Sequence, residues 1–229
     1  MTLNEVIADL KANGSEQTKK TFFKHGAREP YFGVLTEHLK KLQKKIRKDQ
    51  PLAMELYDTG ISDAMYLAGL ICDPSEMSKE DLNHWADKAY WYMISEYVVP
   101  PVAAQSPFGY ELAMEWISSE KEMVASAGWA TLSSIIAKKG EAGIKADKIE
   151  SLLNEIPSVI HTSPNRVRYT MNGFIISSSS YLDDLYELGK KIAVKVGKVQ
   201  VDMGGTACKV PDAIPYIKKV RERRTKIKK

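Results

Sequence analysis

Apolar side chains recur every three or four positions along most of the chain, which is the spacing of an amphipathic α-helix. Leu3, Val6 and Leu10 form one such stripe, and residues 34–46 form a stronger one with lysines on the opposite side. Apolar and polar residues alternate, as they do in a half-buried strand, only at residues 198–202, which we interpret as extended loop. The pattern therefore predicts an all-α protein.

Polar caps, glycines and prolines divide this pattern into short helices. Ser15 suits the start of a helix that Gly26 ends, and Ser78 suits the start of another. Ser163 followed by Pro164 predicts a firm start for a later helix, because proline fits the first helical position. The predicted helices come in pairs with short connections.

Short antiparallel helix pairs have two common packings, a compact bundle and a solenoid of stacked pairs. The chain has no exact internal repeat, but tryptophan recurs at Trp85, Trp91, Trp116 and Trp129, as the packing of helix pairs requires. A HEAT-like repeat has no strict signature, and its length of about 40 residues fits the number of predicted helices. We therefore predict a HEAT-like or armadillo-like solenoid of antiparallel helix pairs with a concave face.

The composition is that of an ordinary globular protein: 44% of the 229 residues are apolar and 27% are charged. The two cysteines, Cys72 and Cys208, form no CxxC pair, and no histidine stands at ligand spacing from a carboxylate or another histidine. We therefore expect no metal or other cofactor, and a reducing, cytoplasmic setting. The N-terminus is not a signal peptide and no apolar run is long enough to cross a bilayer, so we expect no membrane association.

The net charge of +4 conceals an uneven distribution. Residues 218–229 carry +7, which leaves about −3 on the remaining chain. A second basic cluster lies on and just beyond the predicted helix of residues 34–46, at Lys40, Lys41, Lys44, Lys45, Arg47 and Lys48. The clusters favour a polyanionic partner, although a solvated helix and a disordered tail explain them equally well. We expect one domain over residues 1–217 and a basic C-terminal tail, residues 218–229, that acts as a mobile electrostatic tether.

The densest aromatic segment, residues 90–97, offers a first candidate site. Tyr92 and Glu96 are four residues apart on a predicted helix and therefore share one face. A carboxylate beside aromatic rings can stabilise a nearby cation. The alternative is that the rings are core positions and Glu96 lies on the surface, and the residues alone favour that alternative.

A later helix offers a second candidate, because Arg166 and Arg168 lie near its N-terminus, where a phosphate or another anion binds favourably. Arg166, Thr170, Gly173 and Ser177 form a face of small and polar residues headed by a cation. Such a face also suits close packing of a neighbouring helix, which the residues alone favour. The chain contains no nucleophile elbow, no phosphate loop and no Cys–His arrangement.

Several stretches together resemble one protein family: residues 33–42, 91–100, 116–129, 165–176 and 201–213. The most specific are NRVRYTMNGFII at residues 165–176 and VDMGGTACKVPDA at residues 201–213. Over nearly its whole length the chain is similar to DNA alkylation repair proteins of the AlkD-like group, in a branch distinct from the best-known DNA glycosylase. The resemblance implies a right-handed superhelix of HEAT-like helix pairs whose concave, basic surface holds duplex DNA.

The resemblance also implies site residues. Glu96 stands where the family has a catalytic aspartate, Tyr92 replaces a tryptophan, and Phe174 matches a second functional aromatic residue. A carboxylate at that point would stabilise the cationic sugar that forms as an alkylated base leaves, and would position water. The two arginines of the glycosylase site correspond to Ser126 and Ser177, which removes the cations that hold phosphates at a lesion.

The sequence therefore predicts a DNA-binding protein of this family, and three functions stay in view. The first is a DNA N-glycosylase that excises cationic alkylated bases such as 3-methyladenine or 7-methylguanine. The second is a non-catalytic binder of damaged or branched DNA, and the third is a helical-repeat scaffold for other proteins. We expect duplex DNA, alkylated or structured, as partner, and a cytoplasmic location with nucleoid association when DNA is bound. The expected catalytic residues are Glu96, Tyr92 and Phe174, and the expected DNA-binding residues are Trp91, Lys40, Lys44, Lys45, Arg47, Arg166 and Arg168.

Overall fold

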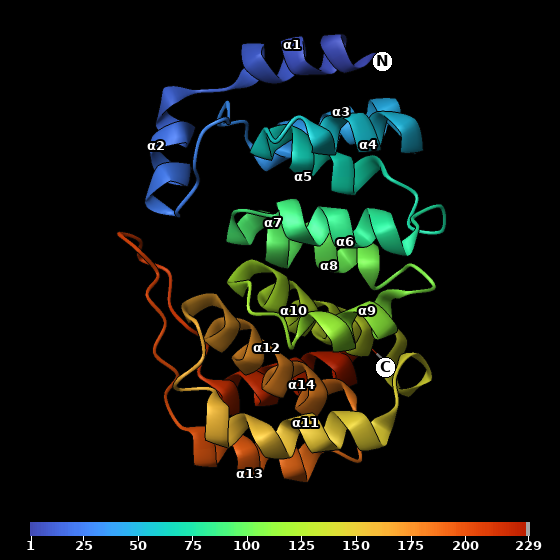
Figure 1. Ribbon diagram of the computed structural model, residues 1–229. Helices are drawn as coiled ribbons and strands as arrows, with labels where there is room; N and C mark the ends of the chain where they lie inside the picture. The colour runs from blue at the N-terminus through green and yellow to red at the C-terminus, as the bar shows by residue number, and fades with distance from the viewer. Residues whose placement is uncertain (228–229) are drawn as a thin grey trace. The chain divides into compact units, whose positions relative to one another are not determined.

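The structure is a computed structural model that describes residues 1–227 (Figure 1). Within these residues the regular structure is helical, and no β-strand is present. The helices are α1 (Leu3–Asn13), α2 (Glu16–Lys24), α3 (Thr36–Ile46), α4 (Gln50–Asp58), α5 (Ser62–Ile71), α6 (Lys79–Lys88), α7 (Tyr92–Tyr97), α8 (Val99–Ala103), α9 (Gly109–Trp116), α10 (Glu122–Lys139), the 3-10 helix η1 (Gly140–Gly143), α11 (Ala146–Val159), α12 (Asn165–Tyr181), α13 (Tyr186–Val196) and α14 (Ala213–Ile227). The all-α prediction is confirmed, and residues 198–202 are loop as predicted.

The chain divides into two compact units. Unit 1 comprises residues 1–108 together with residues 203–207, and unit 2 comprises residues 109–202 and the chain from residue 208 onward. All four tryptophans are buried, Trp85 and Trp91 in unit 1 and Trp116 and Trp129 in unit 2. Their predicted role in packing helix pairs is therefore confirmed.

In unit 1, α5 packs against α3 and α4, and a ring contact joins α4 to α6. The ring of Tyr57 on α4 stacks on Trp85 of α6 at a centroid distance of 4.0 Å, and its hydroxyl donates to the Trp85 carbonyl at 2.6 Å. Polar caps start the helices as the sequence predicts: the Ser15 hydroxyl accepts the Thr18 N–H, and Ser78 forms a reciprocal capping box with Asp81. These caps satisfy backbone groups that the first turn of a helix leaves without partners.

Unit 2 is organised around α10, which packs against α9 and α12. The close contact between α10 and α9 depends on Gly128, where an added Cβ would lie 2.7 Å from the Ile117 nitrogen and 3.0 Å from the Ala113 carbonyl oxygen. A second close approach joins α12 and α13, where a Cβ on Gly189 would lie 2.8 Å from the Ser179 Cβ and closer still to its hydroxyl. Gly173, by contrast, has no neighbour within 4 Å of such a Cβ, so close packing does not require glycine there.

A proline pair divides one segment, and one predicted helix start is wrong. The segment after Trp91 forms two helices, α7 and α8, because Pro100 and Pro101 occupy the first turn of α8, where proline is tolerated. Ser163 does not cap α12, since its hydroxyl donates instead to the Val159 carbonyl at 2.9 Å and Pro164 takes the N-cap position.

The basic C-terminal segment also differs from the expected tail. The boundary predicted after residue 217 falls inside α14, and residues 218–227 continue that helix. Arg221 pairs with Asp183 at 2.9 Å and lies 4.2 Å from the Tyr186 ring centroid, while Arg224 lies 5.0 Å from the Tyr181 centroid. These cation–ring contacts hold the segment on unit 2, so it is part of the fold rather than a tether. The last two tail residues, 228–229, lie outside the described residues.

Candidate nucleic-acid interface

The predicted aromatic site on α7 is tied to α2. The Trp91 indole N–H donates to the His25 carbonyl at 2.7 Å, and its ring lies 5.4 Å from that of Phe22. The Tyr92 hydroxyl lies 2.7 Å from His25 Nδ1. Trp91 is buried in this cluster, so the prediction that its ring contacts DNA is not supported by its position: the ring holds α2 against α7 instead.

Glu96 lies one helical turn after Tyr92 and is only 8% exposed. The alternative that Glu96 lies on the surface therefore does not hold, and a carboxylate withdrawn from bulk water acts more strongly on a nearby cation. Its catalytic role stays a prediction.

Phe174 lies in unit 2 with its ring fully buried. The ring packs edge-on against Trp129 with a centroid distance of 5.0 Å, inside the hydrophobic core of that unit. A DNA sugar would reach this ring only if the ring left the core. Phe174 is therefore a core residue in this structure, and its contact with DNA stays a prediction.

The two arginines of α12 do not form an open anion site. The N–H of Arg166 donates to the Glu122 carboxylate at 2.6 Å, so a side chain from α10 already supplies the anion at this helix N-terminus. The Arg166 guanidinium is buried and lies 4.3 Å from the Tyr169 ring centroid. Arg168 donates to Asn165 at 3.3 Å. The phosphate contacts predicted for this pair are therefore not favoured by the structure.

The lysine face predicted on α3 is exposed. Leu39 and Leu42 turn into the core of unit 1, and the opposite side presents Lys40, Lys44, Lys45 and Arg47 to solvent. These four side chains form no ion pair with any residue in the described part of the chain. We call them the α3 basic face. Because Lys40 and Lys44 are like charges four residues apart, their repulsion lowers the stability of α3 by roughly 0.2–0.5 kcal/mol.

The last member of this face has an unusual backbone. Arg47 follows the final turn of α3 with φ 66° and ψ −133°, and it is the only residue other than glycine with positive φ in residues 1–227. Its N–H donates to the Gln43 carbonyl at 2.7 Å. Glycine is the usual residue in this conformation, and backbone strain of this kind often accompanies function.

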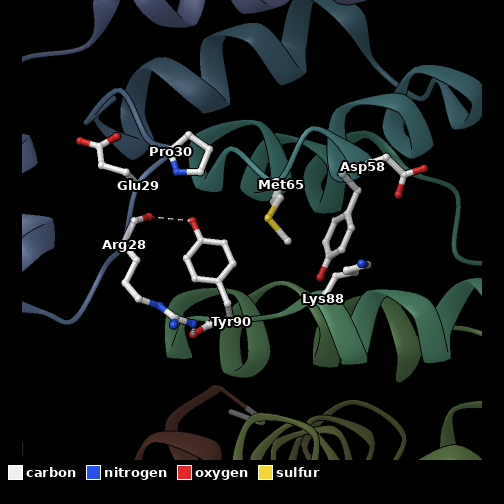
Figure 2. A pocket seen from close by; sticks show the side chains of 9 residues that line it. Arg28, Glu29, Pro30, Asp58, Met65, Lys88 and Tyr90 are labelled. Carbon is white, nitrogen blue, oxygen red and sulfur yellow. Dashed lines mark hydrogen bonds between the residues drawn. The ribbon is translucent and has the colours of Figure 1, made fainter.

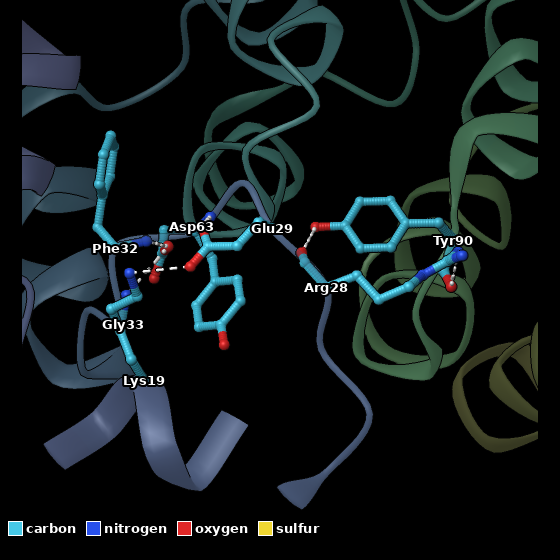
Figure 3. A network of polar contacts seen from close by, with 8 residues as sticks. Lys19, Arg28, Glu29, Phe32, Gly33, Asp63 and Tyr90 are labelled. Carbon is cyan, nitrogen blue, oxygen red and sulfur yellow. Dashed lines mark hydrogen bonds and ion pairs between the residues drawn. The ribbon is translucent and has the colours of Figure 1, made fainter. Parts of the chain in front are cut away.

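The segment that joins α2 to α3 is fixed by one buried carboxylate. Asp63, at the start of α5, accepts the backbone N–H groups of Phe32 at 2.6 Å, Gly33 at 3.3 Å and Val34 at 2.8 Å, as Figure 3 shows in part. Three donors offset the cost of burying the charge. In the same network Lys19 pairs with Glu29 at 2.9 Å, and this contact lowers the pKa of the Glu29 carboxyl. The connection between the two helices is therefore rigid.

A cavity of about 410 Å³ lies beside this segment, between α4, α5 and α6 (Figure 2). Its lining carries two cations, Arg28 and Lys88, and two anions, Glu29 and Asp58. Arg28 donates to the Tyr90 carbonyl at 3.2 Å and accepts the Tyr90 hydroxyl on its own carbonyl at 3.2 Å. The balanced charge and these mutual contacts give the cavity no preference for a phosphate.

No group of three or more potential metal-ligating side chains occurs within the described residues. None of the helices described is long and apolar enough to span a membrane.

Comparison with known proteins identifies the family. Residues 6–187 match the family described as DNA alkylation repair enzyme. The chain belongs to the DNA alkylation repair family. A solved structure related to this family superimposes on 98% of the chain and 95% of its own length, with a TM-score of 0.89 and 38% identity. It is described as a new family of proteins related to the HEAT-like repeat DNA glycosylases with affinity for branched DNA structures. The predicted HEAT-like repeat fold is thereby confirmed.

The chain is also similar to two proteins described as uncharacterized, one of Listeria monocytogenes and one of Listeria innocua. Each is 34% identical over 229 residues, which cover 97% of this chain and 99% of the relative. The resemblance matches Ser126 and Ser177 to two arginines of the glycosylase site, and both serines lie in unit 2 of this DNA alkylation repair protein. Ser126 is fully buried and donates to the Met123 carbonyl at 3.1 Å, and Ser177 is half-buried. Neither can supply a cation.

Two features were not predicted from the sequence: the hydrogen bonds of Asp63 to the segment between α2 and α3, and the outward face of α2. Asp63 is about 30 residues away from its partners along the chain, so no local pattern reveals it. The sequence did contain a signal for the outward face of α2, namely the adjacent pair Phe22 and Phe23. Neighbouring residues of a helix point about 100° apart, so only one of the two rings is expected to enter the core.

Proposed function

We propose that this protein binds branched DNA through the α3 basic face and that it does not excise bases. The observation behind the proposal is the exposure along one helix of four cations, Lys40, Lys44, Lys45 and Arg47, that pair with no carboxylate among the described residues. Lysine and arginine side chains that neutralise phosphates release counterions from DNA, and this release supplies most of the affinity in sequence-independent binding.

Three further observations support the proposal. The solved relative with 38% identity is described as having affinity for branched DNA structures. The resemblance matches Ser126 and Ser177 to two arginines of the glycosylase site, and serine there would leave the phosphates beside a lesion without their cations. The Phe174 ring, which the resemblance assigns to the deoxyribose, is committed to the core of unit 2.

The test is a binding titration by fluorescence anisotropy with a three-way DNA junction and with a linear duplex of equal length. The wild-type protein should bind the junction more tightly, and log K should fall linearly with log salt. Replacement of the α3 basic face by alanine at all four positions should weaken binding to both DNAs. The salt slope should fall by up to roughly 0.9 for each phosphate that the variant no longer neutralises.

A matched control removes the same charge elsewhere. Lys138, Lys139, Lys145 and Lys148 are exposed residues of unit 2, and their joint replacement by alanine changes the net charge equally. This control should bind nearly as well as the wild type. Equal weakening in both quadruple variants would mean that net charge, rather than the α3 basic face, governs binding.

One observation favours a second candidate, the DNA N-glycosylase. By the resemblance, Glu96 keeps a carboxylate at the position of the family's catalytic aspartate, and it is buried one helical turn after Tyr92. If this candidate holds, the protein releases free base from duplex DNA that contains 7-methylguanine or 3-methyladenine, and Glu96→Gln abolishes the release. Absence of release above a no-protein control leaves only the binding function.

A further inference from the structure

Phe23 is the most exposed large apolar side chain among the described residues, at 71% of its surface. Its neighbour Phe22 packs against Tyr31 and Trp91, with centroid distances of 6.3 Å and 5.4 Å. The orientation of α2 is thus set by Phe22, and Phe23 is turned away from the core by about 100°. Water contact on this scale is unfavourable for a phenyl ring, so the position suits a ring that is covered by a ligand.

The helix that presents Phe23 is fixed at both ends. Ser15 caps its start at 3.2 Å from the Thr18 nitrogen. At its end the N–H of Gly26 donates to the Phe23 carbonyl at 2.9 Å and the N–H of Ala27 donates to the Phe22 carbonyl at 3.0 Å, with Gly26 at φ 83°. This is a Schellman motif, which requires the left-handed conformation that glycine adopts readily. Because the backbone of this short helix is fixed by both caps, little conformational entropy of the backbone is lost when the Phe23 ring binds a ligand.

Phe23 shares a hollow with several charged side chains. The hollow is open, has a volume of about 600 Å³, and is lined by Phe23 and Tyr31, by three lysines, Lys19, Lys20 and Lys24, and by two carboxylates, Glu16 and Glu29. Lys19 is paired with Glu29, whereas Lys20 and Lys24 are exposed and form no ion pair with any described residue. Three lysines against two carboxylates give the lining of the hollow a net charge of +1. An aromatic face with two such ammonium groups is the combination that binds a single nucleotide, because the ring stacks on the base and the lysines reach the phosphates.

We propose that Phe23 stacks on an unpaired base at the branch point of DNA, with Lys20 and Lys24 on the flanking phosphates. The inference rests on the proposed function and adds to it the reason for preferring a branch. A continuous duplex offers the ring no free base face, because every base is already stacked. A junction offers unstacked bases where its arms meet, so the ring adds affinity there and not on linear DNA.

The test compares Phe23→Ala and Phe23→Trp with the wild type on a three-way junction with two unpaired bases at the branch and on the matched linear duplex. Phe23→Ala should weaken junction binding by roughly tenfold, the order expected for removal of one base stack, and should leave duplex binding unchanged. Phe23→Trp should restore the preference. A 2-aminopurine at the branch should be quenched by the wild type and by the tryptophan variant but not by the alanine variant.

Val194→Ala is the matched control, since Val194 is 66% exposed on α13 and stands between Lys191 and Lys195. It should bind both DNAs as the wild type does. If the wild type binds the junction and Phe23→Ala binds it equally well, the inference is overturned while the proposed function stands. Equal weakening of Phe23→Ala on both DNAs also overturns it, because the ring then gives no preference for a branch. If the wild type binds neither DNA, the proposed function itself fails.

Discussion

The backbone of Arg47 allows a direct test of whether the turn at the end of α3 stores strain. The perturbation is a pair of substitutions, Arg47→Gly and Arg47→Ala, which remove the same charge. A residue with a Cβ held at φ 66° and ψ −133° costs about 1–3 kcal/mol. Glycine relieves this strain but gives up about 0.5–1 kcal/mol through the greater freedom of the unfolded chain. We therefore expect Arg47→Gly to be more stable than Arg47→Ala by roughly 1 kcal/mol.

The assay is urea unfolding together with amide exchange at the end of α3. The Arg47 N–H, bonded to the Gln43 carbonyl, reports on this turn directly even if the two units unfold separately. Lys45 provides the control, because it lies inside α3 and has helical geometry. There glycine should be less stable than alanine by about 1 kcal/mol, the opposite order. In DNA binding the two Arg47 variants should be weakened equally. An Arg47→Gly protein no more stable than Arg47→Ala would show that this turn stores no strain.

Two further predictions concern unit 2. Gly189→Ala should lower the free energy of unfolding by roughly 1–3 kcal/mol because its Cβ meets Ser179, and adding Ser179→Gly should restore part of that loss. Gly173→Ala, whose Cβ enters open space, should instead raise the free energy of unfolding by about 0.5–1 kcal/mol. Equal effects of the two glycine substitutions in urea unfolding would contradict the close contact between α12 and α13. Deletion of residues 218–229 should lower the melting temperature of unit 2 because it removes the ring contacts of Arg221 and Arg224. Alanine at both Arg223 and Lys226, which are exposed, should leave the melting temperature unchanged. If the deletion also leaves it unchanged, the segment behaves as the mobile tether that the sequence predicted.

Periodicity predicted the helices well because each helix depends mainly on residues three or four apart. It also indicates that Phe174 faces the core, because helical spacing places this residue on one apolar stripe with Val167 and Met171. All three are buried in unit 2. The stripe therefore predicted the core position of Phe174, while the contact with DNA that the resemblance implies for this residue stays a prediction.

The anion site expected on α12 shows what sequence could not supply. Two arginines near a helix start predict an anion, and an anion is present, but it is the Glu122 carboxylate of α10. Glu122 is 44 residues away from Arg166 along the chain, and many other carboxylates in the sequence were equally available as partners. Only the packing of α10 against α12 decides between a protein partner and a phosphate.

In unit 1, the cations available to a binding partner are those that form no ion pair or hydrogen bond within the protein. Lys19 is engaged by Glu29, and Lys48 donates to the Cys72 carbonyl at the end of α5. Lys20, Lys24 and the α3 basic face have no such engagement within the described residues. The segment between them is fixed by Asp63, whose role is to hold backbone rather than to touch a ligand. A charge with no structural partner, on a helix that is itself held rigidly, is positioned for binding in advance. For this reason we propose α2 and α3, rather than α12, as the surfaces that bind DNA.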